Sequence, residues 1–193
     1  MKSNYLIWDS KVVPNACVLK ELVGVEQTSR LRKGVPIAAG FLEGAAFTMD
    51  PDFPDHTLLP DNLINTDGMI VASARLKSFL ESRSPGHVEY LPVAIIDHRG
   101  KPVKSEYFII HPVDPVDCLD LEKCEPTWSA IDKTKIKRLK KLVIDETKVE
   151  KDRGLFKPQS FYNIILTRRD LAEALDKEGF TGIRWIEPET FKS

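Results

Sequence analysis

The sequence lacks the features that mark a secreted, membrane-bound or disulfide-linked protein. Its three cysteines are an odd number and include no C-x-x-C pair, which excludes an evident zinc ribbon or disulfide framework. No stretch approaches the roughly 20 apolar residues that a membrane helix requires, and the N-terminal residues lack the apolar core of a signal peptide. We therefore expect a soluble cytoplasmic protein with reduced thiols.

Signatures of catalysis are also scarce. The glycines at positions 34, 40 and 44 are not followed by Gly-Lys-Ser/Thr, so they form no phosphate-binding loop, and no G-x-S-x-G motif presents a nucleophilic serine. His98 lies beside Asp97, but a turn accounts for both residues. We expect no catalytic residues, no metal and no cofactor, and we predict that the protein is not an enzyme.

One group of residues keeps a metal site open as an alternative. His111, Asp114, Asp117 and Asp120 recur at every third position, as ligands on one side of a tight turn do. Two prolines within the stretch prevent the helix that would align all four side chains, and ligand type without geometry is weak evidence for a metal. The alternative function is a small metal-dependent hydrolase that uses residues 111–120.

Length and charge limit the size and the partners of the protein. The chain has 193 residues, 42% of them hydrophobic, which suffices for one core and is too little for two large ones. The formal net charge is −1, so no global field directs the chain to nucleic acid or an anionic membrane. The basic run over residues 133–141 contains no aromatic residue and is interpreted as a solvated face. We predict a single domain, residues 1–193.

The clearest structural prediction is a β-hairpin over residues 88–110. Two runs, 88–96 and 103–110, are rich in β-branched, aromatic and aliphatic residues, and turn residues separate them. Both faces of the hairpin carry apolar groups near its middle. We therefore expect the hairpin to be covered above and below, as the centre of a sheet is.

The turn of this hairpin predicts a register. Asp97 suits the first position of a type I turn, and Gly100 suits the left-handed position that follows it. This loop would place Tyr90 opposite Phe108. Pro92 cannot donate a hydrogen bond to a neighbouring strand, so we predict a bulge or a free edge at that residue.

Two helices are predicted to pack on the sheet. The first covers about residues 73–83 with Ser73 as its N-cap, and a Pro-Gly pair ends it. The second covers about residues 168–178 with Thr167 as its N-cap, and a strand lies on each side of it. Residues 136–141 are compatible with a helix or a strand. The predicted fold is α+β, with a mixed, mainly antiparallel sheet centred on the hairpin.

The segment that follows a predicted strand at residues 47–49 is acidic, rich in proline and irregular. Loops on a rigid scaffold often carry recognition residues, and an acidic cluster around an exposed aromatic ring suits a basic partner surface. An ordinary Asp-Pro connector would have the same composition. The predicted partner-binding residues are Asp50, Asp52, Phe53, Asp55 and Asp61.

Three sequence pieces resemble a known family. They are VEYLPV and DHRGK in the predicted hairpin and GFTGIRW near the C-terminus. In this order they are similar to the Imm11 class of bacterial immunity proteins, predicted partners of toxins in polymorphic toxin systems. The resemblance covers residues 47–188 and leaves 1–46 as a possible N-terminal subdomain. It implies a protein that binds and neutralises a cognate toxin, and a non-catalytic adaptor module is a further alternative.

Overall fold

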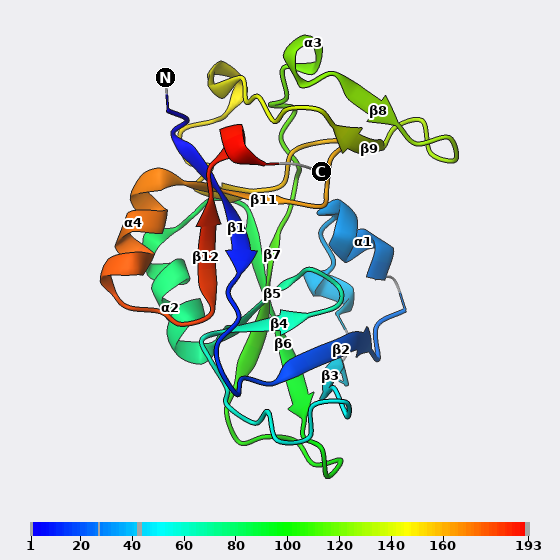
Figure 1. The fold of residues 1–193 in the computed structure, drawn as a ribbon, viewed down its shortest axis with the longest axis vertical. Coiled ribbons are helices and arrows are strands. Elements are labelled where there is room, and N and C mark those ends of the chain that lie inside the picture. Colours follow the sequence, from blue (N-terminus) through cyan, green and yellow to red (C-terminus); the bar gives the residue numbers. More distant parts are fainter. Residues whose placement is uncertain (1, 27, 42–43, 192–193) are drawn as a thin grey trace.

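A closed barrel, a second sheet and a projecting two-stranded unit make up the fold (Figure 1). The computed structural model describes residues 2–26, 28–41 and 44–191. Around the barrel the strands follow in the order β2 (Val18–Val23), β3 (Ala46–Met49), β6 (Val88–Ile96), β7 (Tyr107–Pro112), β5 (Ile70–Ser73) and β4 (Asn62–Asn65). The predicted hairpin therefore supplies two of the barrel strands.

The second sheet has four strands, and the projecting unit has two. The order of the second sheet is β10 (Leu155–Phe156), β11 (Ile165–Arg168), β1 (Tyr5–Ser10) and β12 (Ile183–Ile186). The two-stranded unit consists of β8 (Pro126–Trp128) and β9 (Ile136–Leu139). The segment 1–46 thus contributes β1 to one sheet and β2 to another.

Four α-helices and three short 3-10 helices complete the described fold. The α-helices are α1 (Thr28–Lys33), α2 (Ala74–Arg83), α3 (Leu121–Cys124) and α4 (Arg169–Lys177). The 3-10 helices are η1 (Ala38–Gly40), η2 (Glu146–Lys148) and η3 (Pro188–Thr190). None of the helices in the described residues has the length and apolar composition needed to cross a bilayer.

The barrel forms its core from alternating positions of its strands. On β6, Leu91, Val93 and Ile95 are buried, whereas Pro92 and Ala94 between them are exposed. This alternation is typical of a strand with one face on a core. The other face of the hairpin packs toward α2 near Tyr90, so the expected cover on both sides is present over part of its length.

The two longer helices occupy equivalent positions in two similar units. The helix α2 connects β5 to β6, and β7 lies between these strands with the opposite direction. In the same way α4 connects β11 to β12, and β1 lies between them. Both units are split β-α-β arrangements. The helices share one core, in which the rings of Phe79 and Phe180 meet edge to face at 5.3 Å.

The hairpin turn forms as predicted, but the strand register that we predicted from it differs from the observed register by two residues. The amide of Gly100 donates to the Asp97 carbonyl at 2.9 Å, and Gly100 has a φ of 73°. The predicted register holds where Ile96 faces Pro102. Val103 still donates to the Ile95 carbonyl at 2.9 Å, but residues 104–106 then leave the ladder, which adds two residues to that side. Tyr90 consequently faces Ile110, and Phe108 faces Pro92.

The predictions for Pro92 and for the two N-caps have different outcomes. Pairing of β3 with β6 begins only at Ala94, so Pro92 lies at a free edge as predicted. The Ser73 hydroxyl accepts from the Leu76 amide at 3.2 Å, which confirms that cap. The Thr167 cap is wrong, because Thr167 is a buried residue of β11, paired with strands on both sides, and Arg168 precedes the helix.

The predicted α+β class and the mixed, mainly antiparallel sheet are confirmed. The region 136–141, for which helix and strand were both open, contains strand β9. Closure of six strands into a barrel was not predicted. It depends on two parallel contacts, β2 with β4 and β3 with β6, between segments with no local signal of pairing.

Candidate functional site

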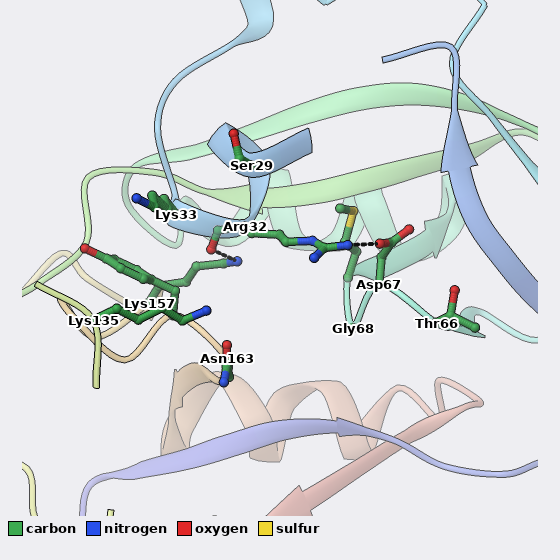
Figure 2. Close-up of a pocket in the computed structure, with 11 residues that line it drawn as sticks. Ser29, Arg32, Lys33, Thr66, Asp67, Gly68, Lys135, Lys157 and Asn163 are labelled. Atoms are coloured by element: carbon green, nitrogen blue, oxygen red, sulfur yellow. Dashed lines mark hydrogen bonds and ion pairs between the residues drawn. The ribbon is translucent and has the colours of Figure 1, made fainter. Parts of the chain in front are cut away.

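A basic pocket of about 490 Å³ lies between α1, the turn before β5 and the start of β9 (Figure 2). Four of its lining side chains are bases, and one is an acid. The basic residues are Arg32, Lys33, Lys135 and Lys157, and the acid is Asp67. Neutral residues complete the lining: Ser29, Thr66, Gly68, Met69, Tyr162 and Asn163.

The acid in this pocket neutralises one base only. One carboxylate oxygen of Asp67 lies 2.6 Å from Nη2 of Arg32, and the other accepts from the Leu22 amide at 2.8 Å. The Asp67 side chain is only 6% exposed. Asp67 therefore forms its ion pair with Arg32, and none of the three lysines of the pocket is ion-paired to this carboxylate.

Lys157 is a buried cation held by backbone carbonyl groups. Its Nζ donates to the carbonyls of Leu31 at 3.3 Å and Arg32 at 3.0 Å, in the last turn of α1. Such carbonyls have no partner within the helix and carry its negative dipole end, so an amine there is favourable. Burial, and then the charge of Arg32, lower the pKa of Lys157 to about 8.

Lys157 should make the stability depend on pH. Its pKa falls from the ordinary lysine value of 10.5 to about 8 in the folded protein, so between these values the unfolded state binds the additional proton. The free energy of unfolding therefore rises with pH in this window, by about 1.4 kcal/mol per pH unit. Between pH 7.5 and 9.5 the wild type should gain about 2 kcal/mol relative to Lys157→Met in urea unfolding. An identical pH dependence of the two proteins would contradict this assignment.

Three of the four candidate metal ligands have partners of their own, and the fourth, Asp117, is exposed. His111 is 2% exposed, burial lowers its pKa, and its Nε2 lies 3.1 Å from the Val35 carbonyl. Asp114 pairs with His87 at 2.8 Å, and Asp120 accepts from the amide and the amine of Lys123. In the part of the chain that the structure describes, no three His, Cys, Asp or Glu side chains are grouped to hold a metal ion.

Four of the five residues predicted to bind a partner share one exposed loop. Asp52, Phe53 and Asp55 are exposed, and the Phe53 ring stacks on His56 with the centroids 5.2 Å apart. The carboxylate of Asp50 accepts from the Asp52 amide at 3.0 Å and fixes the turn. We call residues 50–56 the acidic loop. Its role in binding stays a prediction.

The fifth residue, Asp61, lies in a hydrogen-bond network instead. Its carboxylate accepts from the Ser73 hydroxyl at 2.9 Å and from the Thr181 amide at 2.9 Å. Arg75 adds an ion pair at 3.3 Å. Asp61 therefore joins the barrel, the start of α2 and the approach to β12, and its side chain is only 14% exposed.

A second exposed feature was not predicted from the sequence. Residues 126–141, here called the β8–β9 arm, project from the body of the molecule next to α1 (Figure 1). Within it, Trp128 is 41% exposed and Ile131 is 99% exposed. Trp128 faces Ile136 across the two strands, so the indole lies beside the basic run. The sequence signal that could have indicated this hairpin is a pair of short extended segments on either side of a polar turn.

The comparison with known families decides what kind of protein this is. The model of an immunity protein family, Imm11, matches residues 17–190. The chain belongs to the Imm11 immunity protein family. No curated protein is similar enough to the chain to be matched with it. Membership in Imm11 indicates an immunity function against a toxin.

The Imm11 match extends over more of the chain than the resemblance of the hairpin and C-terminal pieces. It begins at residue 17, before the expected limit at residue 47, and it includes β2, the acidic loop and the β8–β9 arm. The basic pocket lies wholly within the matched residues. Both exposed features of this Imm11 protein thus belong to the family region.

Proposed function

We propose that this Imm11 protein is a cytoplasmic immunity protein of a bacterial polymorphic toxin system, which binds a cognate toxin non-covalently and blocks its action. The observation that carries the proposal is the family match over residues 17–190. A tight and specific complex should bury on the order of 1,600 Å² of surface in total. The barrel is a suitable scaffold, because its strands hold the connecting loops in place.

The acidic loop is our proposed contact region. Phe53 is 43% exposed and is positioned by its stacking on His56. An ordered aromatic side chain loses little conformational freedom on binding, and aromatic residues are frequent interface anchors. The carboxylates of Asp52 and Asp55 beside it would favour a basic toxin surface and accelerate association.

Simultaneous replacement of Asp50, Asp52 and Asp55 by alanine should weaken toxin binding. We expect an affinity loss of about 10-fold to 100-fold, mainly through slower association, because the exposed charges of Asp52 and Asp55 act on the encounter rate and Asp50 fixes the turn that carries them. Surface plasmon resonance at two salt concentrations would measure both rates, and the loss should shrink at high salt. The matched control removes three exposed acids elsewhere and should bind as the wild type does: Asp152, Glu173 and Glu178. Unchanged affinity of the loop variant would remove this loop from the interface.

Co-expression tests the function itself. The toxin is taken as the product of the neighbouring gene, expressed from an inducible promoter with and without this chain. We expect growth to be restored and the two proteins to purify together. Continued killing in cells that contain the folded, soluble chain would contradict the proposal, whichever surface is considered.

A further inference from the structure

The β8–β9 arm carries cations that no carboxylate neutralises. Within the residues that the structure describes, five bases of the arm have no ion-pair partner: Lys133, Lys135, Lys137, Arg138 and Lys141. By contrast, Lys140 pairs with Glu125 at 2.7 Å. The whole chain has a net charge of only −1, so the positive charge of the arm is balanced by acidic residues elsewhere in the chain.

The basic pocket continues this charge at the base of the arm. Lys135 belongs to both, and Asp132 of the arm pairs with Lys33 of α1 at 3.4 Å. Figure 2 shows Lys135, Lys157 and Asn163 gathered on one side of the pocket. The carbonyl contacts of Lys157 only partly offset the cost of its burial, because burial and the charge of Arg32 still disfavour the protonated amine. The one acid of the pocket, Asp67, pairs with Arg32, so a further negative group beside Lys135 and Lys157 would offset their charges.

The arm is fixed to the body through its apolar residues. Ile136 is fully buried and Leu139 is 2% exposed, both in the core that includes Phe161. The Ile136 amide donates to the Ser160 carbonyl at 2.7 Å. The exposed bases between these anchors are consequently presented from a held strand, and their replacement should leave the fold intact.

We infer that the β8–β9 arm and the basic pocket form one docking surface for an acidic segment of the toxin, with a carboxylate of that segment in the pocket. This inference rests on the proposed function, because it specifies the chemistry of the toxin segment that the proposed function requires. A carboxylate would supply the counter-charge that Lys135 and Lys157 lack, and the exposed Trp128 and Ile131 would serve as apolar anchors beside it.

A protein segment fits this surface better than a nucleic acid does. Either partner would supply negative groups to pair with the bases of the arm. Binding of a single strand uses several aromatic side chains as stacking platforms, whereas the arm has one aromatic residue, Trp128, and an aliphatic tip at Ile131. An exposed isoleucine gains most when it is covered by apolar protein surface.

Charge reversal in the arm tests the inference. Replacement of Lys133, Lys137 and Arg138 by glutamate should lower the affinity for the neighbouring gene's toxin by about 100-fold or more, as measured by isothermal titration calorimetry. Circular dichroism and urea unfolding should match the wild type. The matched control reverses three exposed bases outside the arm and should bind within about threefold of the wild type: Lys11, Lys104 and Lys177.

Proton uptake on binding tests the pocket separately. Entry of a carboxylate should favour the charged form of Lys157, so binding at pH 8.5 should take up protons, seen as binding heats that vary with the buffer's ionisation heat. In Lys157→Met this uptake should be absent. The titratable groups around Lys157 are Arg32, Lys33, Asp67, Lys135 and Tyr162 in the pocket, and His111 of β7 behind it, whose pKa is lowered by burial and also by the charge of Lys157. Equal uptake by wild type and variant would overturn the pocket assignment.

The outcomes separate this inference from the proposed function. Equal toxin binding by the wild type and the reversed arm would overturn the inference and leave the proposed function standing. If the wild type itself does not bind the toxin, both fail. A single-stranded oligonucleotide of about 20 nucleotides serves as a further probe. Its binding by the wild type and loss by the reversed arm, with toxin binding unchanged, would assign the arm to nucleic acid and overturn the inference.

Discussion

Gly182→Ala should lower the free energy of unfolding by about 4 kcal/mol. Gly182 has a φ of +83°, and a Cβ at this residue would lie 2.2 Å from the carbonyl oxygen of Asn62. The clash is with backbone, so no side-chain rotation relieves it. Asn62 is fully buried and donates from Nδ2 to the Gly182 carbonyl at 2.8 Å. Separation of the two segments would break the junction between the barrel and the second sheet.

Gly100→Ala is the matched control for this clash. Gly100 has a similar φ of +73°, but no atom lies within 4 Å of the position of an added Cβ. Its replacement should therefore cost about 1 kcal/mol, the penalty of the left-handed backbone alone. Urea unfolding of both variants measures the difference. Equal losses at the two positions would show that the close approach of Gly182 and Asn62 contributes nothing.

Asp61→Ala should cost about 3 kcal/mol of stability. The substitution removes the acceptor for the Ser73 hydroxyl, for the amide and hydroxyl of Thr181, and for Arg75. Hydrogen bonds to a charged group contribute about 1.5 to 3 kcal/mol each, and donors left without a partner add a penalty. Because these contacts connect α2 with the segment before β12, the loss should appear as a lower midpoint of urea unfolding.

Two further variants separate the contribution of the Asp61 hydrogen bonds to stability from that of its negative charge. Asp61→Asn keeps an acceptor for Thr181 and should cost less than Asp61→Ala. Asp52→Ala makes the same substitution at an exposed residue of the acidic loop and should change stability by less than about 0.5 kcal/mol. If Asp52→Ala and Asp61→Ala were equally destabilising, the structural role assigned to Asp61 would be wrong.

Features set by neighbouring residues could be predicted from the sequence. The turn from Asp97 to Gly100, the Ser73 cap and both longer helices follow from local backbone preferences. The strand register could not be predicted, because residues 104–106 leave the ladder after the turn has formed correctly. Thr167 shows the same limit: its side chain suits a cap, but pairing on both sides keeps it in the strand.

Of the two candidate surfaces, the acidic loop could be found in the sequence and the basic pocket could not. The acidic loop was recognisable because its charges are contiguous in sequence, although Asp61 proved to belong to a structural network. The basic pocket was not recognisable, since Arg32, Lys135 and Lys157 come from three distant segments. Only the folded chain brings them together, and the burial that lowers the pKa of Lys157 has no counterpart in the local sequence.

The most direct test of the account is the stoichiometry of neutralisation. A fixed concentration of the purified toxin, well above the dissociation constant, is titrated with the purified chain while the toxin's own activity is followed. Neutralisation by binding predicts a linear fall to an end point at a fixed molar ratio, with intact toxin recovered after denaturation of the complex. Complete loss of toxin activity at a small fraction of that ratio, or no inhibition at any ratio, would contradict the account.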